Sequence, residues 1–142
     1  MTLTQEFLID ILNLIKGDNL YCYLATSFDN LIDSIKNIEA AVINGNYNCS
    51  FHLNDVSKKI LIDNVVKYHS EEYVHNFEIK EENEPLFLAF DGFEIANIAS
   101  KIKLSESFIE KYVRTELCIV WDKIIYPHEQ LKHNIRPTRI MY

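Results

Sequence analysis

The chain has 142 residues and a formal net charge of −7, which fits one domain and excludes a broadly basic surface for nucleic acid. Hydrophobic residues (48%) and charged residues (25%) stand in ordinary globular proportions, so we expect a core of the usual size. Three glycines and three prolines leave no room for a flexible linker or a glycine-rich phosphate loop.

Cysteine usage and the first residues point to the cytoplasm. The three cysteines stand far apart, at positions 22, 49 and 118, so we expect free thiols in a reducing compartment rather than disulfides. The N-terminal residues lack a basic stretch and already include an acid, Glu6, which argues against a signal peptide. No apolar run reaches the ~18–20 residues that span a bilayer, so we expect no membrane partner.

The N-terminal residues predict one helix and one strand. Apolar residues recur at three- and four-residue intervals over 4–15, which is typical of a helix with one buried face. Thr2 or Thr4 can cap this helix, and Gly17 permits a left-handed end. The aromatic and aliphatic run 20–26 is too short for a stable helix and predicts a strand.

A second helix, a short strand and a third helix are predicted next. The second helix covers 29–43, where apolar residues again form one stripe. Alternating apolar and polar residues predict a strand over 47–53, and the third helix runs to about residue 68. Its inward face is expected to include Val56 and Val65. Each helix follows a polar residue that can accept a hydrogen bond from a first-turn amide: Ser27 or Asp29, and Asn54 or Asp55.

The next segment is predicted to hold two strands on either side of an acidic loop. Tyr73, Phe77 and Ile79 mark the first strand. The apolar run 86–90 is typical of a buried second strand. Residues 80–85 between them are mostly charged, so we expect a solvated loop there.

Asp91 and Gly92 allow two structures. As a tight turn they would form a hairpin that continues from Phe93. As a helix start they would open a helix whose buried face includes Ile95. We favour the helix, because three of the following residues have low strand propensity: Glu94, Ala96 and Ala99.

The C-terminal part is predicted to form a short helix, a strand and a tail. Ser105 is placed to cap a helix that ends near Val113, and the run 117–121 is typical of a final strand. Residues 123–142 have no sustained period, so we expect a basic tail, broken by prolines, that packs on a body formed by 1–122. The whole pattern predicts a single α+β domain, with a mixed or antiparallel sheet of about four to five short strands and about four to five helices.

No motif points to a catalytic residue, a metal or a cofactor, and we expect none of them. The nearest metal pattern is Glu72 with His75, a single acid–histidine pair where a di-iron site needs a second. Cysteines in apolar runs have raised pKa values, which disfavours a nucleophilic thiol. Asp91 follows a buried run and is the best candidate for an unusual carboxylate, but a turn or cap role is the simpler interpretation.

Charge is spread unevenly along the chain. Residues 1–122 hold 10 basic and 20 acidic side chains, whereas 123–142 hold four basic and one acidic. The acid is densest between Glu71 and Glu84, where six Glu accompany one Lys among interleaved aromatic residues. Carboxylates beside rigid aromatic anchors suit a basic protein, whose approach they steer. We therefore predict these partner contacts: Glu71, Glu72, Tyr73, Glu78, Glu81, Glu82 and Glu84.

Two segments, EPLFLAFDGF at 84–93 and IKLSESFIEKY at 102–112, resemble parts of small bacterial immunity proteins. Those proteins neutralise the toxins of polymorphic and contact-dependent growth-inhibition systems, and the chain is similar to them in size and acidity. The resemblance implies a cytoplasmic inhibitor whose partner is a cognate protein toxin with a basic surface, often a nuclease. It would bind the toxin one to one and block its active site by steric and electrostatic means, without contacting nucleic acid itself.

Two other functions stay open at this point. An inhibitor from a phage or mobile element that mimics nucleic acid would share the acidity, and its target would be a host protein that binds nucleic acid. A small enzyme that uses Asp91 or a Cys–His pair belongs to a different class. Unreactive native cysteines would exclude its Cys–His form.

Overall fold

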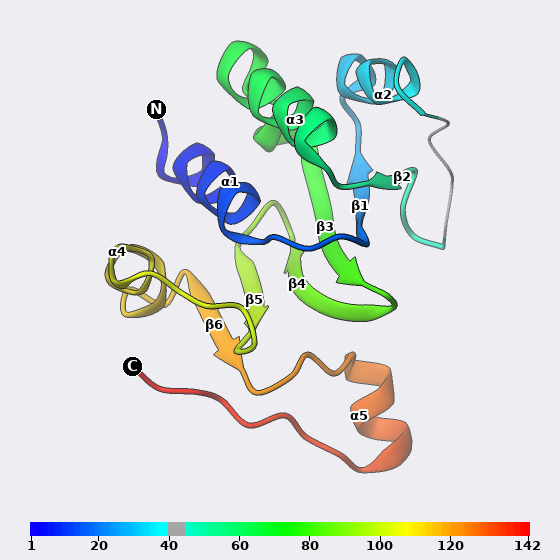
Figure 1. Cartoon of the computed structure of the whole chain (residues 1–142). Helices are drawn as coiled ribbons and strands as arrows, with labels where there is room; N and C mark the ends of the chain where they lie inside the picture. The colour runs from blue at the N-terminus through cyan, green and yellow to red at the C-terminus, as the bar shows by residue number, and fades with distance from the viewer. Residues whose placement is uncertain (40–44) are drawn as a thin grey trace.

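One six-stranded sheet organises the part of the chain that the computed structural model describes, residues 1–39 and 45–142 (Figure 1). Its strand order is β2-β1-β3-β4-β5-β6, and all neighbours are antiparallel except β5 and β6, which are parallel. The strands are β1 (Leu20–Thr26), β2 (Cys49–His52), β3 (Val74–Glu81), β4 (Glu84–Phe90), β5 (Ile95–Ala99) and β6 (Cys118–Trp121). The helices are α1 (Leu3–Leu14), α2 (Asp29–Lys36), α3 (Asp55–Tyr68), α4 (Glu106–Phe108) and α5 (Pro127–His133), with a 3-10 turn η1 (Ser70–Tyr73) and a π turn η2 (Ile109–Val113).

The predicted fold class is confirmed, because the chain forms a single α+β domain with a mixed sheet. The described residues form six strands, slightly more than expected. The additional strand is β5, which lies where we favoured a helix.

α1 and β1 agree closely with their predicted bounds, but α1 does not have the left-handed end that Gly17 would permit, because its cap residue Ile15 is extended and Gly17 does not have a positive φ. α1 begins with a capping box, in which the Thr2 hydroxyl accepts from the Gln5 amide and the Gln5 side chain accepts from the Thr2 amide. Alternate residues of β1 are buried, among them Cys22 and Leu24. Side chains of a strand point to opposite faces in turn, so this alternation gives the sheet two unlike faces.

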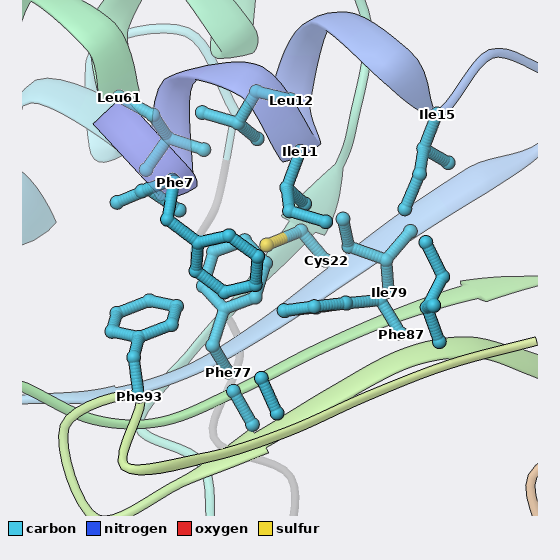
Figure 2. Packing of buried hydrophobic residues seen from close by; sticks show 14 of the residues in the cluster. Phe7, Ile11, Leu12, Ile15, Cys22, Leu61, Phe77, Ile79, Phe87 and Phe93 are labelled. Atoms are coloured by element: carbon cyan, nitrogen blue, oxygen red, sulfur yellow. The ribbon is translucent and has the colours of Figure 1, made fainter. Parts of the chain in front are cut away.

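The core lies between one face of the sheet and a layer of helices. α1, α2 and α3 gather on that side, whereas α5 lies on the other (Figure 1). Figure 2 shows Phe7 and Ile11 of α1 directed toward strand residues that include Cys22, Ile79 and Phe87. These side chains are 3% exposed or less, so the apolar stripe of α1 is fully used in packing against the sheet.

The second and third helices differ in part from the predictions. α2 ends at Lys36, whereas we predicted a helix over 29–43. Residues 37–39 form a turn instead of a further helical turn, and 40–43 lie outside the described residues. Neither Ser27 nor Asp29 caps it, because the cap position falls on Phe28 and no side chain bonds the first turn.

α3 begins as predicted after Asn54, whose side-chain oxygen accepts from two first-turn amides. Val65 is buried as expected. Val56 was expected to face inward, but it is exposed because the buried stripe runs one residue later, through Ser57 and Leu61.

The acidic segment 80–85 is the tight end of a hairpin rather than a loop. Glu81 pairs with Glu84, so only Glu82 and Asn83 form the turn. Their φ angles are 49° and 70°, the left-handed pair that a two-residue type I′ turn requires. The predicted loop is wrong because strand pairing continues into the charged residues.

Replacing Glu82 with asparagine is expected to raise the free energy of unfolding by about 0.5–1 kcal/mol, because asparagine tolerates a positive φ better than glutamate does. The Glu82 carboxylate accepts a hydrogen bond from Asn19 at 3.0 Å, but this contact is exposed and its loss costs little. Urea denaturation measures the difference. Glu84→Asn, at a strand position, is the control, and an equal gain there would contradict the explanation.

The residues after Asp91 form a hairpin, so the helix that we favoured is wrong. β5 pairs with β4 in antiparallel register, and three consecutive loop residues, 91–93, have positive φ. The loop places Phe93 in the core, where its ring centroid lies 6.3 Å from that of Phe7 and 5.8 Å from that of Phe77. Burial of this ring outweighs the helix preference of the residues that follow it.

The short C-terminal helix and the last strand are present as predicted. The Ser105 hydroxyl accepts from the Phe108 amide and caps α4, and the chain continues into η2. Phe108 and Tyr112 are buried as expected.

The tail contains a short helix that was not predicted. α5 begins at Pro127, because proline has no amide to lose at the first helical position. After α5, two tail residues form backbone hydrogen bonds with the end of β6 and the residue after it: Thr138 O accepts from the Asp122 amide, and the Ile140 amide donates to Val120 O. These bonds fasten the end of the tail along the edge of β6.

Candidate functional site

The sheet face opposite α1, α2 and α3 carries polar and aromatic side chains. Strand register aligns Tyr23, Glu78, Leu88 and Asn97 in one row across β1, β3, β4 and β5. The C-terminal tail crosses part of this face and brings Tyr126 to Glu78. The row and the tail together build the candidate site.

Glu78 is the unusual residue of the row, because it is a carboxylate that is only 2% exposed. Its Oε1 accepts a hydrogen bond from the Tyr47 hydroxyl at 3.0 Å, and its Oε2 accepts one from the Tyr126 hydroxyl. Burial, together with the adjacent Glu78 carboxylate, raises the pKa of both tyrosines well above the usual value. Both phenols therefore stay protonated and act as donors.

Lys80 lies two residues after Glu78 on β3 and so projects from the same face. Its Nζ lies 5.1 Å from the centroid of the Tyr23 ring and 5.5 Å from that of Tyr126. Contacts of this length between a cation and an aromatic face are attractive. Among the described residues, no basic side chain forms an ion pair with Glu78.

Two adjoining hollows open on this face. One has a volume of about 630 Å³, and we call it the Glu78 hollow; its walls include Tyr23, Tyr47, Glu78, Lys80 and Tyr126. The other, about 470 Å³, is more apolar and is lined by residues that include Trp121 and Ile124. Leu88, Phe90 and Pro127 line both hollows. Binding sites for small ligands commonly have volumes of roughly 300–1,000 Å³, so either hollow can hold a side chain or a small molecule.

The chemistry of the Glu78 hollow favours recognition of a positive charge. An ionised carboxylate is purely an acceptor, and tyrosine faces attract cations. The raised pKa values of Tyr47 and Tyr126 make these phenols weak acids but leave them able to donate hydrogen bonds. The hollow therefore offers one buried acceptor surrounded by aromatic rings.

The structure does not gather the seven predicted contact residues on one surface. Glu71 and Glu78 are buried, each 2% exposed. Glu72 and Tyr73 are exposed in η1, at the start of β3, whereas Glu81, Glu82 and Glu84 lie around the turn at its other end. The eight residues of β3 separate the two groups by roughly 25 Å, at a rise of about 3.3 Å per residue. These residues therefore do not form one continuous acidic patch.

Part of the acid at the β3–β4 turn is compensated by a lysine. Lys101 Nζ lies 3.0 Å from Glu84 Oε2 and 3.7 Å from Glu81 Oε1. Its hydrogen bond with Glu84 raises the pKa of Lys101. An exposed pair of this kind contributes little to stability, but it reduces the negative charge that a partner meets.

Sequence reasoning named Glu78 but missed the residues around it. The alternation of side chains in β1 and β3 could have indicated two of them, since it places Tyr23 on the sheet face away from the core and Lys80 on the same face as Glu78. No local pattern links Tyr126 to Glu78, because 48 residues separate them. Glu78 is buried by this distant contact, which explains why it looked like a solvated acid.

The three cysteines are free, as the sequence predicts, and all three are buried. Burial raises the pKa of Cys49 to about 11 and that of Cys118 to about 12, and it raises the pKa of Cys22 as well. All three are therefore protonated at neutral pH.

We expect none of the three thiols to react with a disulfide reagent such as DTNB in the native protein at pH 8, because the reagent needs an accessible thiolate. All three should react after unfolding in guanidinium chloride. The absorbance of the released thiolate measures both. Rapid reaction of one native cysteine would contradict the expectation and return a Cys–His enzyme to consideration.

Other candidates from the sequence have ordinary surroundings. Asp91 is exposed in the loop between β4 and β5, as a turn residue would be. In the two described ranges, no group of three His, Cys, Asp or Glu side chains could hold a metal ion, and no helix is long and apolar enough to cross a membrane.

In comparisons with known proteins, no protein-family model, no curated protein and no solved structure matches this chain.

Proposed function

We propose that this chain is an inhibitor of the immunity type, which binds one to one to a basic protein toxin through the sheet face that carries the Glu78 hollow. The observation that carries the proposal is this hollow, where a buried carboxylate lies among tyrosines in a chain of net charge −7. A buried carboxylate with aromatic anchors on one face, in a chain whose net charge is negative, is suited to a cationic partner.

The aromatic residues of this face suit a protein interface. Tyr21, Tyr23 and Tyr47 form a line of rings, with centroid distances of 5.3 Å and 5.6 Å between successive members. All three are half-buried, so they keep surface for a partner while their rotamers are already restricted. Rigid tyrosines give contact area at a low cost in conformational entropy.

In this proposal, the exposed carboxylates outside the Glu78 hollow attract the partner at longer range. Because the exposed carboxylates are spread over the surface, the net charge of −7 would draw in a basic protein from all sides. Contact specificity would then come from the sheet face. Such steering speeds association and weakens as salt screens the charges.

The test has two stages. The tagged chain first captures proteins from a lysate of its native host at low and at high salt, and each retained protein is identified by mass spectrometry. The basic candidate is then purified, and its stoichiometry and affinity are measured by isothermal titration calorimetry. We expect a one-to-one complex that loosens with salt, and inhibition of the partner's toxic activity on binding.

Two charge reversals locate the interface. Glu129→Lys acts at the rim of the Glu78 hollow, whereas Asp33→Lys acts on the exposed side of α2, among the helices. Both change the net charge equally, so any difference reflects position. We expect the Glu129 variant to lose more affinity for the purified partner. Equal effects, or a purified partner that is not inhibited, would contradict the proposal.

A further inference from the structure

We infer that the Glu78 hollow is a receptor for a guanidinium cation, which enters in place of Lys80 and stacks on the rings of Tyr23 and Tyr126. This inference rests on the proposed function for the source of the cation, which is an arginine side chain of the basic partner. To the proposed function it adds the chemical group that is recognised, a guanidinium, and the residue that must move, Lys80.

The floor of the hollow is a buried carboxyl group that forms no ion pair among the described residues. Each Glu78 oxygen accepts one hydrogen bond from a tyrosine hydroxyl, and no basic side chain among the described residues pairs with it. An ionised carboxylate has about four acceptor sites, so two of them remain available to a further donor. A guanidinium supplies planar donors and a positive charge in one group.

The position of Lys80 indicates where a cation is accommodated. Its ammonium already lies over two tyrosine rings, at 5.1 Å and 5.5 Å from their centroids. Lys80 is half-buried and has a flexible stem, so it can turn outward without disturbing the sheet. A guanidinium is favoured over a second ammonium because it is planar, stacks on aromatic rings and is more weakly hydrated.

Size and charge at the entrance are consistent with an arginine side chain. The volume of about 630 Å³ exceeds what one side chain occupies, and Glu129 lies at the rim. Lys80 is the competing positive charge of the site. Its removal should therefore strengthen binding of an external cation, while loss of the Glu78 charge should weaken it.

A small probe tests the site without the partner. Nα-acetyl-arginine amide is titrated into the protein, and Nα-acetyl-citrulline amide, which has the same shape but no charge, is the matched probe. Binding is followed by NMR shifts of the tyrosine ring protons and by the fluorescence of Trp121, the single tryptophan, which lines the adjoining hollow. We expect saturable shifts with the arginine probe only.

Three variants give the direction of each effect. Glu78→Gln should weaken arginine binding about tenfold or more, since it removes a charge-assisted hydrogen bond. Lys80→Met should strengthen binding several-fold. Lys101→Met removes the same charge from the β3–β4 turn, away from the hollow, and should change binding little. If Glu78→Gln is poorly folded by circular dichroism, the pair Lys80→Met and Lys101→Met still decides the question.

The outcomes separate the site from the proposed function. Equal binding of citrulline, or equal effects of the two lysine changes, would overturn the guanidinium site even if a basic partner binds elsewhere. Charge-dependent probe binding with the expected variant effects would support it. If the probe binds in this way but no basic protein associates with the chain, the proposed function fails and the cation site stands.

Discussion

Replacing Phe7 with alanine is expected to lower the free energy of unfolding by about 3–5 kcal/mol, the range typical of a buried phenylalanine. Phe7 is 3% exposed and its ring meets four others. Centroid distances are 5.9 Å to Phe87, 6.3 Å to Phe93, 6.1 Å to Phe108 and 4.9 Å to Tyr112. The change would therefore open a cavity where α1, the sheet, the β4–β5 loop and the C-terminal helical segment meet.

The size of the Phe7 effect depends on how little the surrounding parts can close the cavity. The four neighbouring rings come from three separate segments (β4, the β4–β5 loop and the continuous α4–η2 helical segment), so no single shift fills the space. Denaturation in urea measures the loss, and Leu131→Ala is the control because Leu131 is 84% exposed. The control should stay within about 0.5 kcal/mol of the parent protein. A loss below 1 kcal/mol at Phe7 would contradict this description of the core.

Replacing Glu71 with methionine is expected to stabilise the protein by about 1–3 kcal/mol, because it removes a buried polar group that lacks a partner. Glu71 is 2% exposed, and neither carboxylate oxygen has a hydrogen-bond partner among the described residues. Methionine has a similar length and keeps the volume filled without the cost of a desolvated polar group.

Glu72→Met provides the matched control for this prediction. Glu72 is the next residue in η1 but is exposed, so its replacement should change the unfolding free energy little. Thermal and urea denaturation of the two variants give the comparison. Destabilisation by Glu71→Met alone would mean that the carboxylate contributes favourable interactions, and the prediction would then be wrong. Because Glu71 is buried, we also expect its replacement to leave partner binding unchanged.

Elements with a strong local signal could be predicted from the sequence. The helix that follows Thr2 has a regular apolar period and a fitting cap, and the run 20–26 is apolar and short. The structure reproduces both elements. The segment after Asp91 could not be predicted in the same way. Its conformation depends on Phe93, whose burial against Phe7 joins residues that lie far apart in the chain.

The candidate site, too, could be predicted only where its residues have a local pattern. Strand alternation could have placed Tyr23 and Lys80 on the face of Glu78, since all three lie on two neighbouring strands. The burial of Glu78 depends on Tyr126, which no local pattern connects to it. Glu71 is likewise enclosed by η1 packing against α1 and α3, so a run of acids that suggested one solvated surface contains two interior residues.

α5 joins two anchored points and contributes no buried residue of its own. The tail is held before this helix by the Tyr126–Glu78 hydrogen bond, and after it by the backbone bonds of Thr138 and Ile140. Local opening of 127–133 therefore costs much less free energy than unfolding of the sheet. A protease could cut this segment while the remainder stays folded, and both halves of the severed tail would keep their own attachment to the domain.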